Sequence, residues 1–327
     1  RHYHNLHHLA HMLETADSLT ALAEDFNAIQ LAIWFHDAIY DTRRGDSEER
    51  SAALAEERLA GATGSDCVSL IAAMIRATAG HAMPDLADAA AAQPLYLRAV
   101  DALIAWQLAS RPDALPPYDA ALLGRELTLF PDWYIGRHRD MVLTDAQRGT
   151  LAAAFALIVE RNLAAPAVYV HRDFMPRNLM MPLDGSPALG VLDFQDAVHG
   201  PITYDIASLM RDAFLTWDEP FVIDVTVRYW EKARKTGLLD FEGWSQDFGA
   251  FYRAVEWMGL QRHLKVAGIF ARLTLRDGKP KYLADTPRFL HYIRSTCDRY
   301  RELGPLLKLI DEIEGTTPQV GFAYGRM

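Results

Sequence analysis

Cysteine is almost absent from this chain of 327 residues. The two cysteines, Cys67 and Cys297, lie far apart in the sequence, which excludes a fold held by a disulfide framework. A reducing compartment is therefore expected. Half of the residues are hydrophobic and 10% are aromatic, which is an ordinary soluble globular composition. The length suffices for two domains that each bury a core of their own.

The chain also lacks an excess of positive charge and long apolar runs. It has 33 Lys and Arg against 43 Asp and Glu, a formal net charge of −10. This balance argues against a nucleic-acid partner, because phosphate neutralisation needs a basic face. No apolar run approaches the roughly 18 residues of a membrane span, and no signal peptide is recognisable. We therefore expect no membrane partner and a cytoplasmic location. Position 1 is Arg, so we expect the natural chain to start earlier.

Helical periodicity dominates most of the sequence. Apolar residues recur at helix spacing in residues 1–88, again over 95–106, and beyond Pro201. A stretch poor in large apolar side chains, with proline near both ends, separates the first two of these regions. We therefore expect a helical segment at 1–88, a junction at 89–94 and a second domain at 95–327.

The good β signals surround one polar loop. A β-prone run at 168–170 precedes the loop, and a second short run at 178–181 follows it. Asp184-Gly185 supplies a turn, and residues 190–194 read as the returning strand. The expected fold class is therefore mostly α, with a small β-hairpin beside this loop.

The polar loop carries residues typical of phosphoryl transfer. Asp173 stands in a position to orient an attacking hydroxyl, and Asn178, five residues on, offers an amide oxygen to a metal. Asp193, one strand later, supplies a carboxylate that can bridge the metal to nucleotide phosphates. His171 and Arg172 precede Asp173 and are expected to support the loop. The ordered set, with strand-like flanks, predicts a phosphotransferase site.

Asp205 is a further candidate within the sequence TYDI (203–206). One interpretation makes it a structural acid beneath the loop, where its carboxylate bonds backbone amides. The other makes it an ordinary helix N-cap. The sequence leaves both interpretations open.

The sequence pattern closely resembles the aminoglycoside phosphotransferase and choline kinase-like family. The resemblance runs from about position 95 to about 310 and rests on VHRDFMPRNLM (170–180), LDFQDAV (192–198), GPITYDIASL (200–209) and LQRHLKV (260–266). Within the family it looks like the bacterial cell-wall-recycling kinases that phosphorylate the anomeric hydroxyl of N-acetylmuramate or N-acetylglucosamine. The resemblance implies that Asp173 is catalytic, that Asn178 and Asp193 bind Mg²⁺ with ATP, and that a sugar or amino sugar is the substrate. No motif identifies the sugar-binding residues, although Arg262 and Lys265 either face the substrate cleft or form a solvated basic face.

The upper lobe of a kinase is not recognisable in the sequence. Such a lobe needs a phosphate-covering glycine-rich hairpin and a strand lysine that pairs the nucleotide phosphates. The first lysine of the chain is Lys232, and no Gly-x-Gly-x-x-Gly precedes His171. We therefore expect a kinase-like C-lobe without its N-lobe, which would bind nucleotide poorly.

Six of the twelve histidines lie in the first 36 residues. Histidine and aspartate from neighbouring helices can hold a divalent metal whose bound water hydrolyses phosphate esters. The stretches RHYHNLHH (1–8) and AIWFHDAIYD (32–41) resemble small HD-type metal-dependent phosphohydrolases. The resemblance implies a divalent transition metal on His8, His36 and Asp37. The last aspartate of that pattern has no clear counterpart, since Asp101 lies in sequence that fits the kinase better.

Both resemblances are incomplete at the same place in the chain. A natural fusion explains this, and so does a fragmentary or mis-joined reading frame. Three functions stay open: an ATP-dependent phosphotransferase, which we favour, an HD-type phosphohydrolase, and a non-catalytic fusion remnant. The sequence does not predict the oligomeric state.

Overall fold

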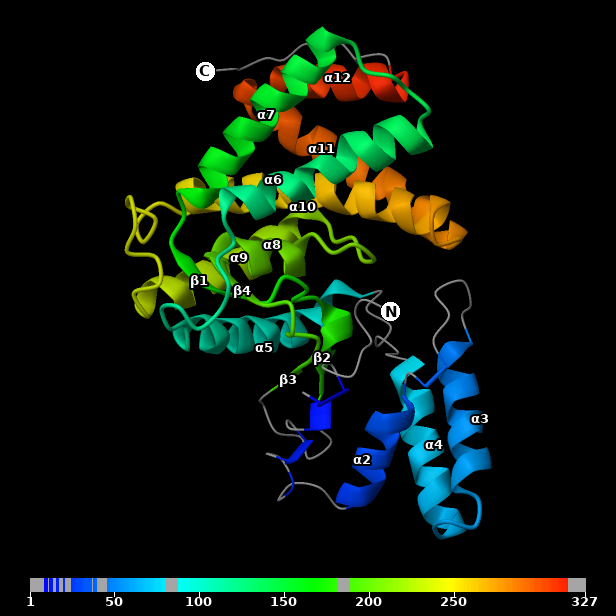
Figure 1. Cartoon of the computed structure of the whole chain (residues 1–327). Coiled ribbons are helices and arrows are strands. Elements are labelled where there is room, and N and C mark those ends of the chain that lie inside the picture. Colours follow the sequence, from blue (N-terminus) through cyan, green and yellow to red (C-terminus); the bar gives the residue numbers. More distant parts are fainter. Residues whose placement is uncertain are drawn as a thin grey trace. The chain divides into compact units, whose positions relative to one another are not determined.

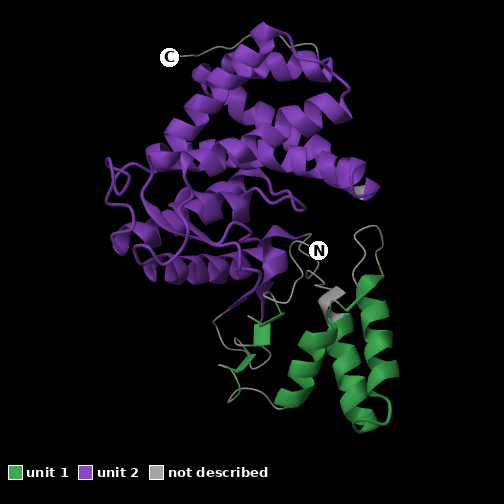
Figure 2. Cartoon of the chain, viewed as in Figure 1, with its two compact units in different colours: residues 1–83 green, residues 84–327 purple. Residues whose placement is uncertain are grey.

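The structure is a computed structural model that describes residues 9–10, 12–13, 16–17, 20, 25–36, 38–39, 46–79, 88–181 and 189–316. The chain divides into two compact units, Arg1–Met83 and Pro84–Met327, which are green and purple in Figure 2. Each unit contains its own cluster of buried hydrophobic side chains. The division falls a few residues before the junction expected at 89–94.

Three helices form most of the described part of the first unit: α2 (Phe26–Phe35), α3 (Ser47–Leu59) and α4 (Ser65–Ala79). Helix α4 packs against both α2 and α3. The core between them consists mainly of small side chains, namely Ala28, Ala32, Ala52, Ala55, Ile71, Ala72 and Ile75. Alanine lets helices approach closely but buries little apolar area, so this core contributes less stability than one of leucine and phenylalanine would.

The second unit opens with three helices, α5 (Ala89–Leu108), α6 (Ala120–Leu129) and α7 (Asp145–Leu163). The helix expected over 95–106 lies within α5, whereas α7 was not predicted. Helix α5 begins six residues earlier than the expected 95, because the Asp88 side chain caps it at Ala90 N, 3.0 Å away. The expected junction residues are therefore helical. Pro94 lies within α5 and removes one backbone donor from the helix, which is why the sequence pattern breaks there.

Two short antiparallel strand pairs flank the polar loop. Strand β1 (Ala167–Val170) pairs with β4 (Val198–Pro201), and β2 (Leu179–Met180) pairs with β3 (Gly190–Val191). The hairpin expected beside the loop is thus present, with fewer paired residues on each side than the sequence suggests. The loop between β1 and β2 is held at both ends by backbone pairing.

Strand β4 has no signal in the sequence, because glycine and proline both disfavour strands. It forms since its partner β1 fixes it, with Val168 opposite Gly200 and Val170 opposite Val198. A Cβ at Gly200 would lie 2.6 Å from the Cβ of Tyr118, which crosses the strand there. Glycine is therefore required at this position by a close approach that only the tertiary structure shows.

The C-terminal part of the second unit is helical, as expected. A π-helix (Phe130–His138) continues α6, and the remaining helices are α8 (Thr203–Met210), α9 (Glu219–Lys235), α10 (Phe248–Leu275), α11 (Thr286–Arg299) and α12 (Gly304–Glu314). Helix α10, yellow to orange in Figure 1, runs through the middle of this unit and contacts α6, α7, α8, α9 and α11. Gly268 permits this packing, because a Cβ there would lie 2.3 Å from the backbone oxygen of Leu129.

The mostly α fold with a small hairpin is thus confirmed. Among the described residues the only strands are the four above, all in the second unit. The expectation that the kinase N-lobe is missing stays a prediction. No helix in the described part of the chain combines the length and apolar character needed to cross a bilayer.

Candidate active site

The loop that carries the candidate catalytic residues leaves β1 at His171 and Arg172. The carboxylate of Asp205, in α8, accepts hydrogen bonds from both backbone amides, at 2.7 Å from His171 N and 3.1 Å from Arg172 N. Asp205 is the third residue of α8 and is 0% exposed, whereas the N-cap position belongs to Ile202. Asp205 therefore ties the loop backbone to α8 and does not cap the helix.

Burial dominates the electrostatics of Asp205. Removal from water raises the pKa of this carboxyl to about 7, and the negative charge of Asp173 contributes to the rise. The two backbone N–H donors and the positive charge of Arg262 act in the opposite direction. Both oxygens of Asp205 accept hydrogen bonds, which is the arrangement that suits an ionised carboxylate.

Two residues of the site have a left-handed backbone. Arg172 has φ of 76° and Asp193 has φ of 66°. For residues with a Cβ this conformation costs about 1–2 kcal/mol, so the surroundings must hold it in place. The hydrogen bond from Arg172 N to Asp205 is one such restraint. Strain of this kind is concentrated at functional sites.

His171 links the loop to the strand that leads to Asp193. Its Nε2 lies 2.8 Å from the backbone oxygen of Leu192, and its Nδ1 lies 3.3 Å from Asp173 N. A backbone oxygen needs a donor and a backbone N–H needs an acceptor, so these contacts select the neutral tautomer with the proton on Nε2. The burial of the ring also lowers the pKa of His171, which favours the same neutral form.

Asn178 brings the two candidate acids together. Its Nδ2 donates to the backbone oxygen of Asp173 at 2.8 Å and lies 3.5 Å from Oδ2 of Asp193. Backbone pairing continues the link, because Leu192 N donates to the oxygen of Asn178 at 2.9 Å. The structure thus places the Asn178 side chain next to the Asp173 backbone and the Asp193 carboxylate, while the roles of the three residues stay a prediction.

Asn178 and Asp193 have the chemistry of a magnesium site. Because Nδ2 of Asn178 is committed to Asp173, the amide Oδ1 is left without a hydrogen-bond donor among the described residues. Asp193 is exposed and receives a hydrogen bond from Gln195. One amide oxygen and one carboxylate fit the hard-oxygen preference of Mg²⁺, which takes its other ligands from water and substrate phosphate. Within the described residues no group of three or more His, Cys, Asp or Glu side chains is placed to hold a metal.

A buried ionic cluster beneath the loop was not predicted from the sequence. Glu126 of α6 is its centre, with Arg172 at 2.5 Å and Lys265 at 2.8 Å. The side chains of Tyr118 and Gln261 also donate to Glu126. The cluster fixes the Arg172 side chain, so the loop is held by Glu126 in addition to Asp205.

The charge of Glu126 is strongly favoured despite its burial. Burial opposes ionisation, but the charges of Lys265 and Arg172 and the hydrogen bonds from Lys265 and Tyr118 lower the pKa of Glu126 to about 2. The sequence does indicate that Glu126 has a charged partner. Glu126 lies on the apolar face formed by Leu123 and Leu127 of α6 and by Phe130, which follows the helix, and an unpaired charge would be costly there.

Arg262 and Lys265 of α10 are both withdrawn from solvent. Arg262 is 5% exposed, and the Lys265 side chain pairs with Glu126 and donates to the hydroxyl of Tyr204 at 3.1 Å. The interpretation of these residues as a solvated basic face is therefore wrong. Burying a charge is costly unless a partner compensates it, so both side chains need a partner.

The residues of the expected HD-type metal site lie mostly outside the described part of the chain. His8 and Asp37 are among these, and no statement of their geometry follows. His36 is described, and its Nδ1 lies 2.6 Å from the backbone oxygen of Ile33, one turn earlier in the chain. That nitrogen is therefore engaged within its own helix.

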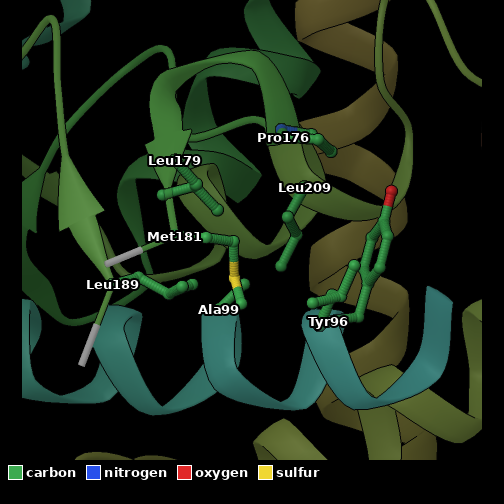
Figure 3. A pocket seen from close by; sticks show the side chains of 8 residues that line it. Tyr96, Ala99, Pro176, Leu179, Met181, Leu189 and Leu209 are labelled. Carbon is green, nitrogen blue, oxygen red and sulfur yellow. The ribbon is translucent and has the colours of Figure 1, made fainter. Parts of the chain in front are cut away.

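An apolar cavity of about 60 Å³ adjoins the hairpin, as Figure 3 shows. Tyr96 and Ala99 reach it from α5, and residues of the loop, the hairpin and α8 complete a wall of Leu95, Tyr96, Ala99, Pro176, Leu179, Met181, Leu189 and Leu209. A cavity with such a wall takes an apolar group more readily than water.

Comparison with known proteins defines the class. The model of the phosphotransferase enzyme family, APH, matches residues 38–244, which is more than half of the chain. The chain therefore belongs to this phosphotransferase family. The matched region starts at residue 38, which lies inside the segment 1–88 and directly after His36 and Asp37.

Three relatives share the name N-acetylmuramate/N-acetylglucosamine kinase. The protein of Neisseria meningitidis serogroup B is 50% identical over 231 residues, 70% of this chain and 67% of the relative. That of Pseudomonas putida is 47% identical over 230 residues, 70% and 66% of the two chains. That of Caulobacter vibrioides is 32% identical over 211 residues, 61% and 55%. This chain thus spans about two thirds of the length of the first two relatives.

Two solved structures match part of the chain. One is a GDP complex of a mutant aminoglycoside 2'-phosphotransferase-IIIa, with a TM-score of 0.40 and 16% identity, covering 67% of this chain and 64% of that one. The other is an ethanolamine kinase of Plasmodium vivax, with a TM-score of 0.42 and 13% identity, covering 64% and 61%. Scores of this size do not establish a shared fold.

Proposed function

We propose that this protein transfers a phosphoryl group from ATP to a hydroxyl of an amino sugar, with N-acetylmuramate and N-acetylglucosamine as substrates. The names of relatives up to 50% identical support this substrate class. The observation that carries the proposal is the Asn178 side chain, which lies between the Asp173 backbone and the Asp193 carboxylate. An enzyme that consumes ATP in this way belongs in the cytoplasm.

Asp173 is the residue that we assign to the acceptor hydroxyl. Its carboxylate would accept a hydrogen bond from that hydroxyl and aim the oxygen at the phosphoryl group, and a positioned base of this kind contributes typically about 10²–10⁴-fold. The neutral His171 supports this role, because its Nδ1 accepts from Asp173 N and thereby fixes the backbone of the catalytic residue. Asp205 holds the preceding residues from below.

Asn178 and Asp193 would hold Mg²⁺ beside the nucleotide. When bound, the ion supplies positive charge that offsets the negative charge of the phosphates. The protein contributes the rigid placement of the two ligands. Nδ2 of Asn178 is tied to the loop, and the left-handed backbone at Asp193 directs its carboxylate from the end of β3. Placement of this kind lowers the entropy cost of bringing the reactants together.

The direct test is ATP turnover with Mg²⁺ over a panel of amino sugars. We expect turnover of N-acetylmuramate or N-acetylglucosamine, and Asp173→Asn should lower kcat by at least about 10²-fold. Asp132→Asn, an exposed aspartate of the π-helix, is the matched control and should leave kcat unchanged. Absence of turnover by the wild type, or equal activity of the Asp173 variant, refutes the proposal.

The HD-type hydrolase and the non-catalytic remnant stay predictions from the sequence. Manganese-stimulated phosphatase activity that is lost in Asp37→Ala would support a transition-metal site on His8, His36 and Asp37. Protein that purifies without metal and gains nothing from Mn²⁺ would count against it. Tight ATP binding by calorimetry would reject the non-catalytic alternative.

A further inference from the structure

Three arginines from three different elements surround one buried aspartate. Asp212 follows α8 and is 2% exposed. Burial raises the pKa of its carboxyl, and the charges of Arg262, Arg177 and Arg288 act against that rise. Arg177 comes from the catalytic loop, Arg262 from α10 and Arg288 from α11. Three elements therefore contribute positive charge that acts on Asp212.

The two most buried members of this cluster are not hydrogen-bonded to each other. Asp212 Oδ1 accepts from Phe214 N at 2.7 Å, but its Oδ2 is buried and has no donor among the described residues. The Nε of Arg262 is equally buried, and no acceptor for its guanidinium occurs within residues 88–181 and 189–316. An unmet buried polar atom costs about 1–3 kcal/mol, and more when charged. A structure rarely leaves two such buried atoms without a partner unless something else binds them.

The basic side chains nearby differ in their partners. Arg288 donates to the backbone oxygen of Ala213 at 2.7 Å and to Asp285 at 3.2 Å. Lys265, one turn further along α10, is satisfied by Glu126. Arg262 lies over the ring of Tyr204, with Cζ 5.1 Å from the ring centre, and Arg177 lies over the ring of Phe214. Neither guanidinium has a hydrogen-bond acceptor among the described residues, and Arg262 is the buried one of the two.

The cluster adjoins the catalytic loop. The charges of Arg262 and Asp173 both act on Asp205, which bonds the backbone at the start of the loop. Arg177 lies between Asp173 and Asn178 in sequence, and its Cζ is 3.9 Å from the ring centre of Phe214, two residues after Asp212. A ligand at the arginine cluster would thus reach the loop that carries Asp173.

We propose that Arg262, flanked by Arg177 and Arg288, binds the carboxylate of an acidic amino sugar and so determines which sugar is preferred. This inference rests on the proposed function and deepens it. N-acetylmuramate differs from N-acetylglucosamine by a lactyl ether that carries a carboxylate, and a guanidinium binds such a group through two parallel hydrogen bonds.

The test compares the affinities of the full chain for the two sugars by calorimetry. In Arg262→Gln we expect the ratio of N-acetylmuramate to N-acetylglucosamine affinity to fall about 10- to 100-fold, the range expected when a charged hydrogen-bond pair is lost. The matched control is Arg253→Gln on the same helix, where the arginine pairs with exposed Glu302 and should leave the ratio unchanged. An unchanged ratio in Arg262→Gln overturns the proposal.

A second variant keeps the test decisive if Arg262→Gln does not fold. Arg288→Gln removes a half-buried arginine of the same cluster, and we expect a smaller fall in the same ratio, about 3- to 10-fold. If the variant binds MgATP more weakly while the ratio of the two sugar affinities is unchanged, the cluster binds phosphate rather than the sugar carboxylate, and the proposal is overturned. If the wild-type protein binds neither sugar, the proposed substrate class is refuted. If the wild type binds both sugars and the variants keep the same affinity ratio, the arginine site alone is refuted.

Discussion

Replacement of Glu126 by glutamine gives the sharpest test of how the loop is held. The substitution keeps the shape of the side chain but removes the carboxylate that pairs with the Arg172 guanidinium and the Lys265 ammonium group. Two cations would then share a site in which Glu126 is 7% exposed. Removal of one partner from a buried ion pair typically costs roughly 3–5 kcal/mol, because the remaining charge is left uncompensated.

The pKa of Glu126 gives a separate estimate of the free energy that the ion pairs contribute, and the two values are similar. A fall from the ordinary 4.5 to about 2 corresponds to about 3 kcal/mol of favourable interaction in the folded state. The folded-state pKa lies below that of the unfolded chain. The contribution is therefore complete above pH 4.5 and is lost as the pH falls towards 2. We expect Glu126→Gln to lower the free energy of unfolding by about 3 kcal/mol at pH 7.

The assay is urea unfolding followed by tryptophan fluorescence. Six of the seven tryptophans lie in the second unit, so the signal reports on the unit that contains Glu126. Glu231→Gln, an exposed glutamate of α9, serves as the control and should change the unfolding free energy little. A Glu126→Gln difference below about 1 kcal/mol at pH 7, or one that does not shrink below pH 4.5, would refute the reasoning.

Three further predictions concern how tightly particular residues are packed. Gly268→Ala should destabilise the second unit by at least about 1–3 kcal/mol in the same urea assay, because its Cβ would meet a backbone oxygen at 2.3 Å. Gly124→Ala, a helical glycine with open space around it, should stabilise by about 0.5–1 kcal/mol, and a loss of stability there would contradict the packing described. Burial raises the pKa of the Cys297 thiol to about 12, so only half-buried Cys67 should react with a thiol reagent at pH 8 in native protein. Two reactive thiols per native chain would disprove this.

The sequence predicts the parts of the site that depend on local order. Asp173, Asn178 and Asp193 come together because a short strand, a tight loop and a hairpin place residues of that spacing side by side. The strand before the loop and the helices after Pro201 follow from β propensity and helical periodicity in the same way. Such features need no knowledge of distant segments.

The parts that the sequence does not predict depend on partners far along the chain. Glu126 meets Lys265 across 139 positions, and no local pattern connects them. Strand β4 contains Gly200 because Tyr118 passes within contact distance, so the residue that weakens the strand signal is the one that the fold requires. Asp205 could be a cap or a support from sequence alone, since both uses place an aspartate near the start of a helix.

The two buried carboxylates restrain the same residue by different means. Asp205 holds the backbone N–H of Arg172, and Glu126 holds its guanidinium. Because Arg172 has φ of 76°, the chain would relax towards a right-handed backbone if either restraint were removed, and the relaxation would rotate the peptide that leads to Asp173. Asp173, to which we assign the catalytic role, is itself bonded through its backbone to His171 and Asn178. The backbone that leads into Asp173 is restrained by two buried acids, one in α6 and one in α8.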